Sequence, residues 1–287
     1  MKMNHNHLEI SNSFYTMWSP VLILFVIVVG ILYFRMVGPW REGFKHSEPV
    51  ETWRKVMFTV GLVLFYLTQG SPINYYGHHY LFSLHMLQQS ILYLIVPILI
   101  ILGLPEWFLK PVFQIKWLYK IVRFFTFPLV SLLFFNVTFS IYHLPLVMDY
   151  LMENELALFG YHAMLLFAAF MMWFPIFVAH PDFNKMPSMQ KMLYIFANGI
   201  LLTPACALII FAGDLLYAMY RDVSFTTTVY SVLDDQQLGG VIMKIVQEIV
   251  YGIVLYSIFR KWYRTERKQH PDELSDEPQE GMVYNHA

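Results

Sequence analysis

Residues 77–90 read GHHYLFSLHMLQQS and run directly into the apolar residues 91–105, ILYLIVPILIILGLP. A helix over this stretch places His78, His85 and Gln89 on one face, because residues four and seven positions apart lie above one another. Polar side chains at that depth are costly in lipid. We therefore expect a membrane-spanning helix whose polar face points into protein or into a wet cavity.

The composition indicates an integral membrane protein. Hydrophobic residues make up 57% of the chain and charged residues only 14%, whereas soluble domains carry about 25% charged residues. The apolar runs have lengths near the roughly 20 residues that cross a bilayer core. The single cysteine, Cys206, lies in one of these runs. The chain therefore has no intramolecular disulfide and no Cys-x-x-Cys metal or redox site.

Seven apolar runs predict an all-α bundle of seven transmembrane helices. Their expected bounds are 18–36, 53–69, 80–104, 122–143, 155–178, 191–212 and 238–259. Proline inside such spans is tolerated because neighbouring helices can satisfy the freed backbone groups. We expect three regions: an N-terminal arm over 1–17, the transmembrane domain over 18–262, and a disordered acidic tail over 263–287. The segment 214–237 is expected to form a loop that contains a short helix.

The positions of lysine and arginine predict the orientation. Sixteen of the 19 lysines and arginines fall on alternate loops or on the tail after the seventh span. Cytoplasmic loops of membrane proteins carry this excess of positive charge. We therefore expect the N-terminus outside and the C-terminus in the cytoplasm. The protein is expected to be a multi-pass membrane protein in contact with the lipid bilayer.

This orientation gathers histidines near the outer surface. Three of them, His85, His143 and His162, lie at similar depths near the outer ends of predicted spans. Methionines and aspartates follow them closely in the sequence or open the seventh span. Imidazole with thioether suits copper, especially Cu(I), and imidazole with carboxylate suits zinc or iron. Buried histidines that only bridge helices are the alternative. The candidate metal ligands are His85, Met86, His143, His162 and Asp235, with His78, His79 and Met243 as secondary candidates. We expect His78 and His79 in a loop at the membrane edge.

Several enzyme and binding classes have no support in the sequence. It contains no glycine-rich phosphate loop, no His-Glu-x-x-His and no Gly-x-Ser-x-Gly. Basic and aromatic residues form no pattern typical of nucleic-acid binding. We therefore expect a protein that is not an enzyme and has no nucleic-acid partner.

Four motifs in order resemble one family. They are His85-Met-Leu-Gln-Gln followed by Pro97 and Leu102-Gly-Leu-Pro105; Tyr142-His-Leu-Pro145 with Tyr150; His162 followed by Trp173-x-Pro175; and Asp235-Gln-Gln-Leu-Gly-Gly-x-x-Met243. Together they resemble the CtaG family of multi-pass membrane proteins, which assemble caa-type cytochrome c oxidase in Bacillus-like bacteria. The correspondence covers roughly residues 15–262.

The resemblance implies a multi-pass protein of a bacterial cell membrane with oxidase subunits as partners. The copper centres of such an oxidase lie at or near the outer side of the membrane, where this chain concentrates histidine and methionine. Many relatives carry a histidine where this chain has Gln89 and a tryptophan where it has Lys244. An unrelated single-span copper chaperone shares the name CtaG, and its cysteine motif is absent here. The principal hypothesis is an assembly factor, or chaperone, of the respiratory chain that holds copper transiently. The alternatives are a metal-free scaffold for a nascent oxidase subunit and a membrane redox protein with haem between paired histidines.

Overall fold

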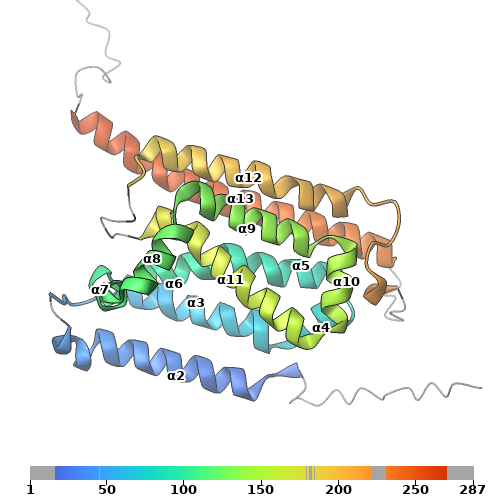
Figure 1. Cartoon of the computed structure of the whole chain (residues 1–287), viewed down its shortest axis with the longest axis horizontal. Helices are drawn as coiled ribbons and strands as arrows, with labels where there is room; N and C mark the ends of the chain where they lie inside the picture. Colours follow the sequence, from blue (N-terminus) through green and yellow to red (C-terminus); the bar gives the residue numbers. More distant parts are fainter. Residues whose placement is uncertain are drawn as a thin grey trace, which may run out of the picture.

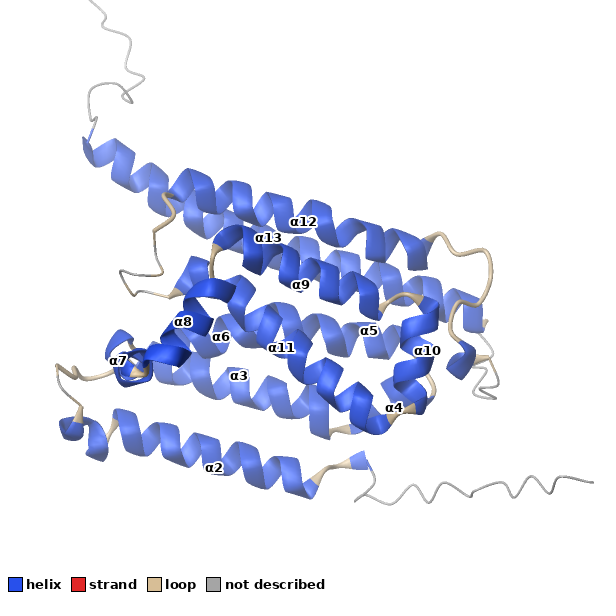
Figure 2. Cartoon of the chain, viewed as in Figure 1, coloured by secondary structure: helices blue, strands red, loops and turns tan. Residues whose placement is uncertain are grey.

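The computed structural model describes residues 17–44, 46–178, 180, 183, 185–221 and 231–269. Within these ranges the backbone forms helices, turns and loops, and no strand (Figure 2). The predicted all-helical class is therefore confirmed. The expected N-terminal arm lies outside the described residues except for Met17.

The chain forms a bundle of long helices joined by short ones. The helices that reach through the bundle are α2 (Pro20–Val37), α3 (Thr52–Gly70), α5 (Phe82–Ser90) with η2 (Ile91–Ile95) and α6 (Val96–Gly103), α9 (Pro128–Tyr142), α11 (Glu155–Phe177), α12 (Ser188–Ile210) and α13 (Val232–Gln269). The short elements are η1 (Pro39–Gly43), α4 (Pro72–His79), α7 (Glu106–Gln114), α8 (Lys116–Phe125), α10 (Pro145–Glu153) and η3 (Ala218–Tyr220). Six stretches of the described chain are long and apolar enough to cross a membrane, or seven if α8 and α9 count as one bent span.

The helices pack in layers. Helix α2 lies along one side against α3, while α12 and α13 form the opposite side (Figure 1). Helices α5, α6, α9 and α11 lie between these sides and enclose the core (Figure 1). Its centre is aromatic, with Tyr93, Phe135 and Trp173 fully buried. A smaller cluster attaches α2, in which the ring of Tyr33 stacks at 3.7 Å on that of Phe58.

Close contact between α3 and α6 depends on a missing side chain. A Cβ atom placed on Gly103 would lie 2.6 Å from the Cβ of Phe58 and 2.8 Å from its backbone nitrogen. The Tyr33 hydroxyl donates to the Gly103 carbonyl at 2.8 Å. Because transmembrane helices approach closely only where a small residue allows it, Gly103 determines how α2, α3 and α6 meet.

The third span is interrupted by one π-helical turn, η2, before Pro97. Proline has no N–H to donate to the carbonyl of Tyr93, four residues earlier. The indole Nε1 of Trp173, on α11, donates to that carbonyl instead, at 3.2 Å. A neighbouring helix thus satisfies the group that the proline frees, as predicted for prolines inside spans.

The fourth predicted span, 122–143, is wrong as a single straight helix. Helices α8 and α9 meet at an angle of 73°. Phe127, which precedes Pro128, is extended with ψ 126°, because the proline ring disfavours a helical conformation at the residue before it. Thr126 donates its hydroxyl to the Val122 carbonyl at 2.7 Å and ends α8. The crossing helix therefore begins at Pro128.

Two further boundaries differ from the prediction. His78 and His79 lie in helix α4, not in a loop. This helix begins because the Ser71 side chain accepts from the N–H of Ile73 at 3.2 Å and Pro72 follows it. Helix α13 continues through Gln269, into the region expected to be a disordered tail, and residues 270–287 lie outside the described residues.

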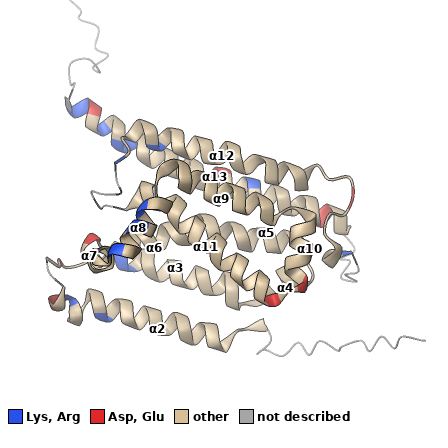
Figure 3. Ribbon diagram, in the orientation of Figure 1, with Lys and Arg blue, Asp and Glu red and all other residues tan. Residues whose placement is uncertain are grey.

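Basic residues gather at one end of the bundle. Lysines and arginines concentrate where α7, α8 and the last turns of α13 lie (Figure 3). Helices α4 and α10 lie at the other end (Figure 1). The two ends of the bundle therefore differ in charge.

Candidate functional site

Five polar side chains from four helices meet at the end of the bundle opposite to the basic residues. We call them the histidine cluster: His78 on α4, His85 and Gln89 on α5, Tyr142 on α9 and His162 on α11. The Tyr142 hydroxyl lies 3.3 Å from Nε2 of His85 and 3.1 Å from Nε2 of His162. Gln89 Nε2 lies 2.9 Å from His85 Nε2. The cluster therefore links α5, α9 and α11 by side-chain hydrogen bonds.

His78 completes the cluster from the side of α4. Its ring packs edge-on against that of His85, with centroids 4.9 Å apart, and its centroid lies 5.8 Å from that of His162. Gly77 allows this approach, because a Cβ there would lie 3.0 Å from the backbone nitrogen of His85. The structure thus brings together two of the principal predicted ligands, His85 and His162, and one secondary candidate, His78.

His143 lies beside the cluster rather than in it. Its ring packs on Phe139, with centroids 4.3 Å apart, and meets Tyr142 edge-on at 5.0 Å. The Tyr217 hydroxyl donates to the His143 carbonyl at 3.0 Å. His143 follows the last residue of α9, and burial lowers the pKa of its imidazole to about 4. The ring is therefore neutral at physiological pH.

Backbone carbonyls select the tautomer of several histidines. Nδ1 of His143 lies 2.8 Å from the Phe139 carbonyl, and Nδ1 of His78 lies 3.1 Å from the Asn74 carbonyl. A carbonyl only accepts, so Nδ1 carries the proton in each ring and Nε2 keeps its lone pair. A histidine oriented in this way presents a nitrogen suited to bind a metal.

Two imidazole nitrogens near the cluster are buried without a hydrogen-bond partner. They are Nδ1 of His85 and Nε2 of His143, and both rings are 0% exposed. The side-chain oxygen of Gln89 is also buried without a partner. Gln89 Nε2 can only donate, so Nε2 of His85 accepts its hydrogen bond and Nδ1 of His85 carries the proton. Nε2 of His143 and the Gln89 oxygen are the acceptors that leave capacity for a further ligand.

The other predicted ligands lie elsewhere. Met86 follows His85 and points to a different face of α5, because successive helical residues are about 100° apart. It packs toward α13, where a Cβ on Gly239 would lie 3.0 Å from its Cγ. Asp235 accepts hydrogen bonds from the backbone N–H and the hydroxyl of Ser83. Met243 is buried in the core. These three side chains join helices and are not members of the cluster.

A cleft of about 480 Å³ adjoins the histidine cluster. His78 and His162 lie in its wall, so both side chains contact the cleft as well as the cluster. Its other lining includes three methionines that were not predicted as site residues: Met17, Met152 and Met219. We call it the methionine-lined cleft. Across the described part of the chain, no three His, Cys, Asp or Glu side chains are grouped so that they could hold a metal ion.

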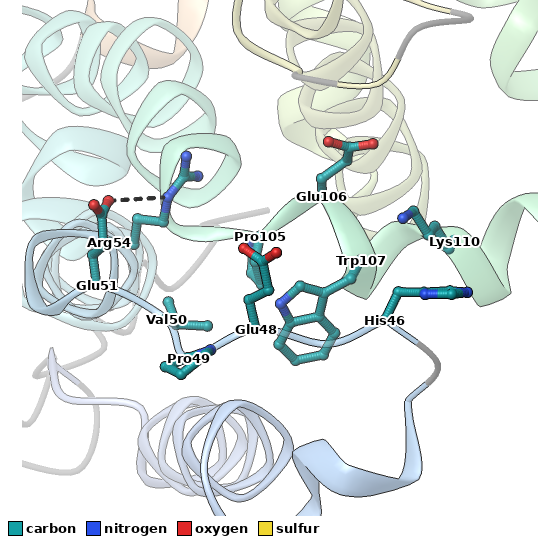
Figure 4. Close-up of a pocket in the computed structure, with 10 residues that line it drawn as sticks. All are labelled: His46, Glu48, Pro49, Val50, Glu51, Arg54, Pro105, Glu106, Trp107 and Lys110. Atoms are coloured by element: carbon teal, nitrogen blue, oxygen red, sulfur yellow. Dashed lines mark ion pairs between the residues drawn. The ribbon is translucent and has the colours of Figure 1, made fainter.

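A second hollow lies at the basic end of the bundle, between the start of α3 and α7 (Figure 4). Glu51 and Arg54 form an ion pair there with 3.9 Å between Oε2 and Nε (Figure 4). Nη1 of Arg54 also donates to the carbonyls of Leu102 and Leu104, which end α6. These contacts assign Glu51 and Arg54 to the junction between the start of α3 and the end of α6.

Sequence reasoning missed Tyr142 as a member of the site. This residue precedes the predicted ligand His143 and therefore points to another side of α9, where it meets His85 and His162. Tyr142 is fully buried, and a buried tyrosine hydroxyl usually has a hydrogen-bond partner. Here the partners are the two histidines.

The comparisons with known proteins place most of the bundle in one family. The family model described as cytochrome c oxidase caa3 assembly factor matches residues 31–265. No curated protein and no solved structure matches the chain significantly. The matched region runs from within α2 to the last turns of α13 and includes the entire histidine cluster. This chain belongs to the cytochrome c oxidase caa3 assembly factor family.

Proposed function

We propose that this protein assists the assembly of caa3-type cytochrome c oxidase by holding a copper ion transiently at the histidine cluster. The observation that carries the proposal is that His85 and His162 converge on the Tyr142 hydroxyl beside the methionine-lined cleft. Imidazole and thioether together suit Cu(I). The proposal keeps His85 and His162 as ligands, adds His78 in place of Met86 and Asp235, and places His143 next to them.

The state of the histidines supports the capture of a cation. Nε2 of His143 keeps its lone pair and is buried without a hydrogen-bond partner. Because a metal ligand must be unprotonated, a neutral imidazole such as that of His143 needs no deprotonation before binding. Among the described residues, no three His, Cys, Asp or Glu side chains are grouped so that they could hold a metal ion. An incomplete ligand set is compatible with an ion that is held only transiently and then released.

The topology that fits this role has the methionine-lined cleft on the outer side. Lysines and arginines mark the opposite end as cytoplasmic by the positive-inside rule (Figure 3). This orientation puts the residues before α2 outside and the end of α13 in the cytoplasm of a bacterial cell. The cleft then opens on the side where the copper centres of the oxidase are expected, and the client is an oxidase subunit.

Two alternatives make different demands on the same residues. A haem between His85 and His162 needs a gap between the rings, but the Tyr142 hydroxyl lies within 3.3 Å of both Nε2 atoms. This geometry disfavours the haem hypothesis. A metal-free scaffold uses the histidines only as hydrogen bonds between helices. In both the copper role and the scaffold role, the protein is not an enzyme.

A cellular assay separates copper handling from scaffolding. The test variant is His85→Ala/His162→Ala, and the matched control is Asn136→Leu/Asn198→Leu. The control removes another buried polar contact that α9 makes, in which Nδ2 of Asn136 donates to Oδ1 of Asn198 at 2.9 Å. Each variant is quantified in the membrane, and assembled oxidase is measured by its haem spectrum and by its bound copper.

We expect the histidine variant to accumulate in the membrane but to yield little copper-loaded oxidase, with partial recovery when copper is added to the medium. The asparagine variant is expected to assemble oxidase normally. Normal assembly in the histidine variant would refute copper handling. If broad substitution of a helix surface then abolished assembly, the scaffold would stand.

A further inference from the structure

A charged pair lies on the lipid-facing side of the bundle, between α12 and α13. Nζ of Lys244 is 2.7 Å from Oε1 of Glu248 and also donates to the Thr203 hydroxyl at 3.0 Å. The two residues are four positions apart and therefore share one face of α13. The Lys244 side chain is 29% exposed, whereas that of Glu248 is 62% exposed. The carboxylate is thus the part of the pair that faces outward.

Both helices place this pair near the middle of the membrane. Glu248 is roughly ten residues from each end of the apolar segment 238–259, which is about 15 Å at 1.5 Å per residue. That distance is half of a hydrocarbon core of about 30 Å. Gly199, which lines the same groove, lies midway along α12. Ionisable residues at this depth are costly and are commonly functional.

The groove around the pair has a floor of small residues. Its volume is about 230 Å³, and Gly199 and Gly252 line it together with Thr203 and the pair. A Cβ placed on Gly252 meets nothing within 4 Å, and one on Gly199 has its nearest contact at 3.6 Å. The apolar walls include Ile195, Phe196, Ile200 and Leu255. Small residues beside a polar group are the surface on which transmembrane helices pack closely and form hydrogen bonds.

We propose that this groove is the docking site for a transmembrane helix of a separate membrane polypeptide, which presents a hydrogen-bond donor to Glu248. Oε1 of Glu248 is paired with Lys244, and the Glu248 side chain stays 62% exposed. Lys244 is already bound to Glu248 and Thr203. The more exposed charge of the pair is therefore the negative carboxylate of Glu248. A partner helix that complements it carries a hydrogen-bond donor or a cation at the same depth in the membrane.

A second copy of this chain is a poorer occupant. If it docked with the same groove, it would offer a second Lys244–Glu248 pair, in which the lysine is already bound to Glu248 and Thr203. The lipid-facing surface of α2 is made of large apolar side chains such as Val21, Phe25 and Ile31. It therefore offers no donor to Glu248 at the middle of the membrane.

The test uses the full-length chain in its native membrane, with a photo-cross-linking amino acid at Ile200 in the groove or, as a control, at Ile27 on α2. Both side chains are about half exposed, at 55% and 49%. We expect an adduct with a different polypeptide at Ile200 only. The cross-linked peptide should be a transmembrane helix with a donor side chain within one turn of the adduct.

Two variants should reduce this adduct about tenfold. Lys244→Leu/Glu248→Leu removes both charges, so that neither is left unpaired, and Gly252→Leu fills the groove. The matched control is Gly160→Leu on α11, since a Cβ at Gly160 also meets nothing within 4 Å. If Gly252→Leu fails to accumulate, Gly252→Ala replaces it with a smaller obstruction. An adduct only with a second copy or with lipid, or an adduct that these variants leave unchanged, would overturn the proposal.

Discussion

The hydroxyl of Tyr142 holds the histidine cluster together, and Tyr142→Phe removes that single atom. The substitution deletes a hydrogen bond of 3.1 Å to His162 and a longer one of 3.3 Å to His85. A buried neutral hydrogen bond contributes about 1 kcal/mol, and interhelical bonds in membrane proteins average about 0.6 kcal/mol. Counting the long contact as half, we expect a loss of about 1–1.5 kcal/mol in the free energy of unfolding, or about 2–6 °C in Tm.

The measurement is thermal unfolding of the purified protein in detergent, with Tyr161→Phe as the matched control. The Tyr161 hydroxyl donates to the Thr138 carbonyl at 2.9 Å and joins the same two helices, α11 and α9, outside the cluster. Both variants should lose similar stability. A double-mutant cycle with His162→Ala then separates them.

Tyr142→Phe and His162→Ala should be non-additive by about 1 kcal/mol, because both remove the same hydrogen bond. Tyr161→Phe and His162→Ala remove hydrogen bonds that share no partner, so their non-additivity should be smaller than that of the first pair. Additivity in the first pair would refute the assignment of Tyr142 as the bridge between the histidines.

Three further predictions concern packing, backbone satisfaction and pH. Gly103→Ala forces its new Cβ to within 2.6 Å of the Cβ of Phe58 and should cost about 1–3 kcal/mol from overpacking, measured as lost thermal stability. Trp173→Phe leaves the Tyr93 carbonyl without its donor and should cost about 1–3 kcal/mol in chemical unfolding. The third concerns His143, whose pKa is about 4 in the fold against 6.5 in the unfolded chain. The unfolded state binds the proton first, so stability should fall between about pH 6.5 and 4 by at most about 3 kcal/mol, a loss that His143→Gln removes.

Matched variants show whether these effects are specific. Gly252→Ala faces open space and should be close to neutral. Trp262→Phe loses only a bond from its indole to Glu266, four residues later, and should cost a few tenths of a kcal/mol. His79→Gln replaces an exposed histidine and should keep the slope of stability against pH that His143→Gln loses. Equal effects in test and control variants would contradict the contacts named for each test residue.

Apolar length alone predicts most of this fold. Six of the seven expected spans correspond to long apolar helices, because about 20 apolar residues in lipid have no alternative to a helix. The failure at 122–143 comes from local backbone chemistry. Pro128 restricts Phe127, and the chain turns there by 73° although hydropathy continues across the turn. The helix that carries His78 was missed because a capping serine, Ser71, begins it outside the apolar pattern.

The site was predictable in part. Depth along the spans brought His85 and His162 to one level, and the structure joins them through a tyrosine. Depth says nothing about direction around a helix, and for that reason Met86 and Asp235 were expected beside histidines that they do not face. The methionines of the cleft lie far apart in the sequence: Met17 precedes α2, Met152 lies on α10 and Met219 lies in η3. Only the three-dimensional packing brings them together.

The most direct test of the proposed role is the amount of copper bound by the purified protein. Full-length protein is loaded with Cu(I) under reducing conditions beside His85→Ala/His162→Ala, with Asn136→Leu/Asn198→Leu as the control for a lost buried polar pair. We predict about one copper per chain in the native protein and in the asparagine variant, and little in the histidine variant. Absence of binding in the native protein, or equal binding in the histidine variant, would contradict copper handling at the histidine cluster.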